Sequence, residues 1–95
     1  MSDPLQDRIR VPEHVVYRDF GDETVILNLE SGNYHGLNGT AAAMLKVLGE
    51  SESVAAAVER LTAELGQDRA VIERDVVSLC GALSERGLIE RDAGG

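Results

Sequence analysis

The side chains that could carry out chemistry are few: one cysteine, Cys80, and two histidines, His14 and His35. Nucleophilic catalysis needs a base within hydrogen-bond reach of the nucleophile, and no motif spacing places one beside Cys80. A single cysteine forms no internal disulfide and supplies too few ligands for zinc. Cys80 is therefore interpreted as a small buried apolar residue, with no catalytic residue, metal or cofactor expected. A Cys80–His35 pair is the catalytic alternative that the sequence leaves open.

The charge balance argues against a nucleic-acid partner. The 95 residues hold 9 Lys+Arg against 17 Asp+Glu, a formal net charge of -8, whereas nucleic-acid binding needs a basic stripe. No apolar stretch approaches the about 20 residues that span a bilayer, and the acidic residues 1–7 are unlike a secretory signal. These features predict one small cytoplasmic domain with neither a nucleic-acid nor a membrane partner.

The elements that must position these side chains begin with strands. Residues 11–20 are strand-like, with β-favouring residues at their centre, and residues 24–29 alternate between two faces. One face holds Val25, Leu27 and Leu29, and the other holds Thr24, Ile26 and Asn28. Turn residues at 30–33 predict a hairpin whose return strand is 34–37. Residues 1–10 lack periodicity and are expected to form a mobile arm.

From residue 38 onward the apolar period becomes helical. Asn38 or Thr40, Ser53 and Asp68 are capping residues for helices over 41–48, over 54–65 and from 69 to the terminating Gly87. Their predicted core stripes are Met44, Leu45 and Leu48; Val54, Val58, Leu61 and Leu65; and Ile72, Val76, Leu79 and Leu83.

Three strands followed by three helices predict an α+β domain of winged helix-turn-helix type over residues 11–90, with a three-stranded antiparallel N-terminal sheet. Residues 91–95 are expected to fray. A winged helix invites comparison with a DNA-binding regulator, which is an alternative function. The second and third helices mix acidic with basic side chains, however, and a recognition helix offers mainly donors to bases and phosphates.

Peptide binding is favoured by two features. The short strand 34–37 can leave a sheet edge unpaired, to which an extended peptide can add. The third helix carries a strip of mostly small side chains, which leaves a trough beside the core stripe. That strip is Val71, Asp75, Ser78 and Ala82, flanked by Arg74 and Gly81. The alternative is that these small residues let another helix of the same protein pack closely.

Residues 27–38, Leu-Asn-Leu-Glu-Ser-Gly-Asn-Tyr-His-Gly-Leu-Asn, resemble the signature of the PqqD-like family: a strand, a glycine turn, an aromatic residue and Leu-Asn before a helix. The resemblance extends over about residues 11–90. It implies a non-catalytic leader-peptide recognition element for ribosomally made, post-translationally modified peptides, with three strands and three helices. The precursor's leader would add as a strand to the third strand and enter a groove against the third helix.

Carried over to this sequence, the resemblance implies a peptide-binding site on one strand and one helix. Its residues are Asn33, Tyr34, His35, Gly36 and Leu37 on the strand and Arg74, Asp75, Ser78, Leu79 and Ala82 on the helix, with Val71 added from the strip. Arg74 or Asp75 would pair with a leader charge at the rim.

The family serves several pathways. The run from Ser31 to Asn38 is more similar to the free-standing recognition protein of lasso-peptide biosynthesis than to the pyrroloquinoline quinone protein. The lasso reading implies a leader peptide, a separate cysteine-protease-like leader peptidase and, as a further candidate, an ATP-dependent cyclase. The quinone reading implies its own precursor and a radical SAM enzyme. Either pathway is compatible with a protein that is a monomer or a weak dimer.

Overall fold

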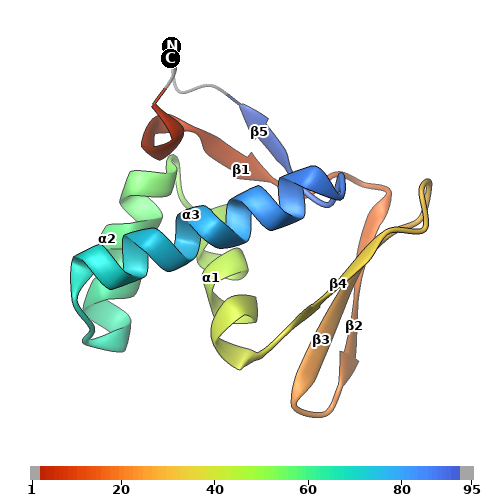
Figure 1. The fold of residues 1–95 in the computed structure, drawn as a ribbon, viewed down its shortest axis with the longest axis horizontal. Coiled ribbons are helices and arrows are strands. Elements are labelled where there is room, and N and C mark those ends of the chain that lie inside the picture. The colour runs from red at the N-terminus through yellow and green to blue at the C-terminus, as the bar shows by residue number, and fades with distance from the viewer. Residues whose placement is uncertain (1–2, 93–95) are drawn as a thin grey trace.

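The computed structural model describes residues 3–92 and has the predicted α+β class (Figure 1). A three-stranded antiparallel sheet, β2-β3-β4, precedes three helices, and a second sheet pairs β1 with β5. The elements are a 3-10 turn at Pro4–Gln6, β1 Arg8–Arg10, β2 Val15–Phe20, β3 Glu23–Asn28, β4 Tyr34–Leu37, α1 Gly39–Glu50, α2 Val54–Leu65, α3 Arg69–Glu85 and β5 Glu90–Asp92. Over these described residues, no helix has both the length and the apolar character that crossing a membrane requires.

The two-stranded sheet corrects the expectation of a mobile arm over residues 1–10. Strand β1 pairs antiparallel with β5, with Ile9 opposite Arg91, and Ile9 is almost fully buried. The Arg91 Nε donates to the Asp7 carboxylate at 3.1 Å. These partners lie at opposite ends of the chain, so no local period in the sequence could reveal them. Of the expected frayed end, Arg91 and Asp92 belong to β5, and residues 93–95 lie outside the described residues, as do 1–2.

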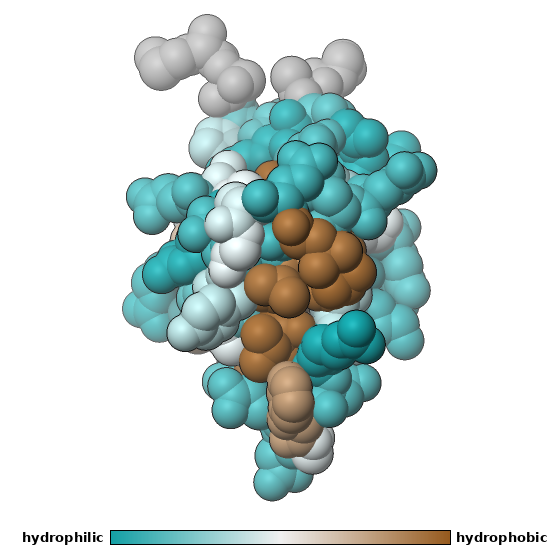
Figure 2. Space-filling model, turned by 90° about the vertical axis from the view of Figure 1, so that its right-hand side faces the viewer, coloured by the Kyte–Doolittle hydropathy of each residue, from teal (hydrophilic) through white to brown (hydrophobic). Residues whose placement is uncertain are grey.

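The three-stranded sheet has one face packed on the helices and one face open. On β3 the inner face holds Ile26, which is fully buried, and Asn28, which is 5% exposed. The outer face is the one that the alternation assigned to Val25, Leu27 and Leu29, and Leu29 is 61% exposed. Figure 2 shows apolar side chains gathered on the side of the molecule where this sheet lies.

The helices supply most of the core. On the third helix, one of the four core positions differs from the prediction. Its buried residues are Ile72, Val76, Cys80 and Leu83, so Cys80 is the small buried residue that the sequence predicts. Leu79, predicted as core, is only partly buried. Cys80 follows Val76 by one helical turn and occupies the core position, while Leu79 packs against the core from its edge. Leu65, also predicted as core, is 38% exposed because it ends α2.

The C-terminus of α3 ends in a Schellman motif. Gly87 has a positive φ of 67°, the Leu88 N–H donates to the Leu83 carbonyl at 2.9 Å, and the Gly87 N–H donates to the Ser84 carbonyl at 3.1 Å. A left-handed residue at this position favours glycine because it lacks a Cβ. The predicted terminator therefore acts as expected, and it leaves the Gly87 carbonyl facing the sheet.

A buried amide ties this helix end to the β3–β4 hairpin. The Asn28 Nδ2 donates to the Gly87 carbonyl at 2.9 Å. The Asn28 Oδ1 accepts from the N–H groups of Glu30 at 2.9 Å and Ser31 at 3.1 Å. A second, exposed contact runs from the Asn33 Nδ2 to the Arg86 carbonyl at 3.3 Å. The hairpin and the end of α3 are thereby held at a set separation.

We predict that Asn28→Asp lowers the free energy of unfolding by about 1–3 kcal/mol at neutral pH. The substitution keeps the shape and the accepting oxygen, but it replaces the donor to Gly87 with an acceptor that faces a carbonyl. Urea unfolding measures the effect, and Asn33→Asp is the matched control, since its single bond is longer and exposed. An unchanged urea midpoint for Asn28→Asp would show that the buried amide is not a stabilising link.

Candidate functional site

Strand β4 leaves one edge of the sheet without a partner among the described residues. At its start, Gly32 and Asn33 both oppose Asn28: the Gly32 N–H donates to the Asn28 carbonyl, and the Asn28 N–H donates to the Asn33 carbonyl, each at 2.8 Å. Gly32 has a φ of 80°, so the pair forms a glycine-type β-bulge. This bulge sets the register in which Ile26 faces His35.

The register decides which backbone groups the free edge presents. Antiparallel strands alternate between residues that bond across the pair and residues that point away from it. Asn33 bonds to β3, so His35 and Leu37 also point toward β3. The N–H and C=O groups of Tyr34 and Gly36 therefore point outward from the edge.

Two adjoining hollows run beside this edge, and we refer to them together as the groove. The first has a volume of about 390 Å³ and is lined by His35, Asn38, Thr40, Ala41, Met44, Asp75, Ser78, Leu79 and Ala82. The second has a volume of about 450 Å³ and is lined by Gly32, Asn33, Tyr34, His35, Gly36 and Arg86. Since His35 lines both hollows, they meet at the middle of β4.

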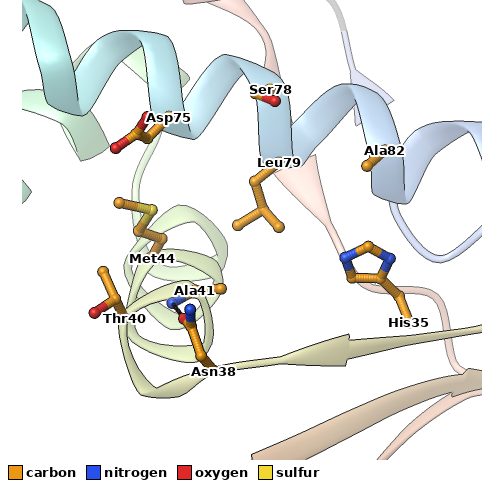
Figure 3. Close-up of a pocket in the computed structure, with 9 residues that line it drawn as sticks. All are labelled: His35, Asn38, Thr40, Ala41, Met44, Asp75, Ser78, Leu79 and Ala82. Carbon is orange, nitrogen blue, oxygen red and sulfur yellow. Dashed lines mark hydrogen bonds between the residues drawn. The ribbon is translucent and has the colours of Figure 1, made fainter.

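The close-up shows how the first hollow is built (Figure 3). Leu79 and Asp75 project from α3 toward α1, while His35 lies on the β4 side below Ala82. Met44 rises from α1 beneath Asp75. The walls are therefore apolar in the middle, with polar groups at the rim. Such an arrangement suits apolar side chains of an extended ligand.

The structure brings most of the predicted site residues together. Asp75, Ser78, Leu79 and Ala82 share the first hollow with His35. Asn33, Tyr34 and Gly36 share the second. The Tyr34 side chain is 67% exposed and pairs with Leu27 on the outer face of the sheet.

Three predicted residues lie outside both hollows. Leu37 is 1% exposed and belongs to the core, because its side chain points inward from β4. Val71 lies on α3 beyond the first hollow. Arg74 points into solvent, with its Nε 3.6 Å from the Asp75 carboxylate. The two hollows therefore cover a shorter part of α3 than the predicted strip, and peptide contacts by these three residues stay a prediction.

Sequence reasoning missed the residues that α1 and the end of α3 contribute. Asn38, Thr40, Ala41 and Met44 line the first hollow, although the sequence assigned them only capping or core roles. A residue's contribution to a groove between elements depends on how those elements pack. Arg86 was findable, since it continues the helical stripe that runs through Asp75, Leu79 and Ala82.

Cys80 lies in the core and outside both hollows. Burial raises the pKa of its thiol to about 11, and the nearby Asp7 carboxylate adds to this effect while Arg91 opposes it. A thiol held protonated at neutral pH is a poor nucleophile. Over residues 3–92, no three side chains of the His, Cys, Asp and Glu types are grouped to hold a metal ion.

An open strand edge faces a helix across a groove with an apolar middle, and this arrangement suits an extended peptide. The chain belongs to the PqqD family, since residues 23–89 match the family described as coenzyme PQQ synthesis protein D. A comparison with curated protein sequences found no significant match.

Two solved structures are similar to this chain over most of its length. "TbiB1 in Complex with the TbiA(beta) Leader Peptide" is 31% identical with a TM-score of 0.73, and the match covers 85% of this chain and 94% of that one. "Lasso peptide synthetase B1 complexed with the leader peptide" is 30% identical with a TM-score of 0.75, and the match covers 87% and 98%. Each match therefore covers nearly all of the chain in that structure, and both structures are complexes with a leader peptide.

The raised pKa of Cys80 predicts a pH-dependent stability. The folded chain keeps the thiol proton up to about pH 11, whereas the unfolded chain releases it at a lower pH. Unfolding therefore releases a proton, and the free energy of unfolding should fall by about 1.4 kcal/mol for each pH unit between the pKa of the unfolded thiol and about pH 11. Urea titrations at alkaline pH measure this slope. In Cys80→Ala this contribution should vanish, and equal slopes in the two proteins would contradict the prediction.

Proposed function

We propose that this protein binds the leader region of a ribosomally made precursor peptide of the lasso-peptide type, without catalysing a reaction itself. The observation that carries the proposal is the open edge of β4, which faces α3 across the groove. The two similar solved structures, both leader-peptide complexes, support it.

In this proposal the leader adds to the sheet as a further strand. The outward N–H and C=O groups of Tyr34 and Gly36 bond to its backbone, each bond contributing about 0.5–1.5 kcal/mol. Side chains of a strand alternate between faces, so every second leader residue enters the groove beside Leu79 and Ala82. The other leader residues lie next to Tyr34 and continue the apolar outer face of the sheet (Figure 2).

The groove supplies specificity and the strand edge supplies general affinity. Backbone bonding is the same for any extended peptide, whereas the apolar middle of the groove selects for side chains that fill it.

The captured precursor is then presented to a separate cysteine-protease-like leader peptidase, and to an ATP-dependent cyclase, in the cytoplasm. Binding raises the effective concentration of the precursor at the enzyme. The protein acts as a monomer or weak dimer, since β4–β4 pairing would occupy the site.

The family match supports a second candidate, binding of the pyrroloquinoline quinone precursor together with a radical SAM enzyme. Fluorescence polarisation distinguishes the two. A precursor found among the open reading frames that neighbour this protein's gene is labelled at its leader and titrated against the protein, beside a quinone precursor. Tighter binding of a lasso-type leader supports the first proposal. Tighter binding of the quinone precursor supports the second, and failure to bind either leader removes both.

Gly36→Pro should weaken leader binding by up to about tenfold, the loss of one backbone bond, while leaving the helices folded. Proline lacks the N–H that Gly36 presents to the open edge, but the bonds between β4 and β3 do not use that N–H. The matched control is Gly36→Ala, which keeps the N–H. In both variants the new Cβ would approach the Glu23 Oε1, the end of a side chain that can move. Unchanged leader affinity for Gly36→Pro, measured by fluorescence polarisation, would rule out pairing at this edge.

Ala82→Trp should weaken leader binding by at least tenfold, because the indole fills the groove above His35. The matched control is Val77→Trp on the same helix, at a position that is 37% exposed and outside both hollows. The control should bind the leader like the unmodified protein. If both variants bind equally well, the groove does not receive leader side chains.

A further inference from the structure

One stripe of α3 lines the whole groove and carries opposite charges at its two ends. Asp75, Leu79, Ala82 and Arg86 follow one another at helical spacings of four, three and four residues. Asp75 lines the first hollow and Arg86 lines the second. The two stripe residues between them, Leu79 and Ala82, are uncharged. The groove is therefore acidic at one end, apolar in the middle and basic at the other end.

The two charged ends of the groove lie beside the two ends of β4. Arg86 lies beside the start of the strand, where its carbonyl accepts from the Asn33 Nδ2 at 3.3 Å. Asp75 lies beside the end of the strand, in the hollow that Asn38 and Thr40 also line. Helix α3 thus runs opposite to β4, and Figure 3 shows Ala82 above His35 with Asp75 farther along toward α1.

The separation of the two charges matches a spacing of four residues in an extended peptide. Asp75 and Arg86 are eleven positions apart on a helix that rises about 1.5 Å per residue, or about 16 Å. An extended peptide rises about 3.3 Å per residue, and only alternate residues face the groove. Two groove-facing residues four apart span about 13 Å, and the length of a Lys or Glu side chain covers the remainder.

Both charges are available to a ligand. The Asp75 carboxylate pairs only with Arg74 among the described residues, at 3.6 Å, and both side chains are exposed. Such an exposed pair is weak and exchanges readily. Arg86 forms no ion pair within residues 3–92; its Nη1 donates to the Ala82 carbonyl at 3.3 Å.

We propose that the groove selects peptides by charge order: a basic residue, an apolar residue two positions later and an acidic residue two positions after that. This order rests on the proposed function and on antiparallel addition to β4. The existing sheet is antiparallel throughout, and antiparallel pairing is the more stable kind per residue. The N-terminal base then meets Asp75 beside the end of β4, and the C-terminal acid meets Arg86 beside its start.

Three synthetic peptides test the order, with the cores Lys-Thr-Leu-Thr-Glu, Glu-Thr-Leu-Thr-Lys and Gln-Thr-Leu-Thr-Gln in identical flanks. Each is titrated into the ¹⁵N-labelled full chain at low salt, with the amide signals of Tyr34 and Gly36 as the readout. The Lys-first peptide should bind about tenfold more tightly than the Glu-first peptide, with the neutral peptide between them. Added salt should narrow this difference.

Charge exchange on the protein provides the reciprocal test. In the double variant Asp75→Lys, Arg86→Glu the preference should invert, so that the Glu-first peptide binds more tightly. The matched control, Arg69→Glu with Glu73→Lys, exchanges an ion-paired couple on the same helix outside both hollows and should keep the original preference. If the double variant does not fold, Arg86→Gln alone should narrow the difference in affinity between the Lys-first and the Glu-first peptide.

The outcomes separate this inference from the proposed function. Equal affinities for all three peptides, with the Tyr34 and Gly36 signals shifting, would overturn the charge order and leave the edge site standing. Tighter binding of the Glu-first peptide to the unmodified protein would also overturn it. If no peptide shifts these two signals, the edge site fails and the charge order fails with it.

Discussion

The buried amide of Asn28 joins two parts of the molecule that are distant along the chain. It donates to the last turn of α3 through the Gly87 carbonyl and accepts from the loop that begins β4. A buried polar group without its partner costs about 1–3 kcal/mol, so all three bonds must form together. That requirement sets the distance between α3 and the hairpin, and the groove occupies the space between them.

The groove exists because two features of the fold remain incomplete. Within residues 3–92, strand β4 has a partner on one side only, and α3 lines the groove beside it in part with the small side chains of Ser78 and Ala82. An unpaired strand edge is usually protected, because it can pair with another chain. Here the edge is short, since β4 spans Tyr34–Leu37. The groove beside it can receive the side chains of a strand that pairs with this edge. A bound strand would complete both the sheet and the packing of α3.

The chemistry of the site is that of recognition. Its polar groups are backbone amides, neutral side chains such as Asn38, Thr40 and Ser78, one histidine and two exposed charges at its ends. The single thiol lies in the core, where burial raises its pKa. In the proposed function, affinity from the strand edge would be independent of the peptide sequence, and the apolar and charged parts of α3 would add selection. This division explains how a chain of 95 residues can recognise a peptide without a deep cleft, since the peptide itself supplies the second wall.

The sequence alone determined the three helices, the β3–β4 hairpin and four of the groove residues of α3, Asp75, Ser78, Leu79 and Ala82, because capping, turn chemistry and helical period are local properties. Only the tertiary structure decided that β1 pairs with β5, that Ile26 faces the core, and that Cys80 rather than Leu79 fills the core position. It also added Met44 and Arg86 to the residues that line the groove, and it placed the side chain of Leu37 in the core. These outcomes depend on contacts between distant segments. On β3 the face with more apolar residues, Val25, Leu27 and Leu29, is the outer one, so the alternation by itself does not identify the buried face.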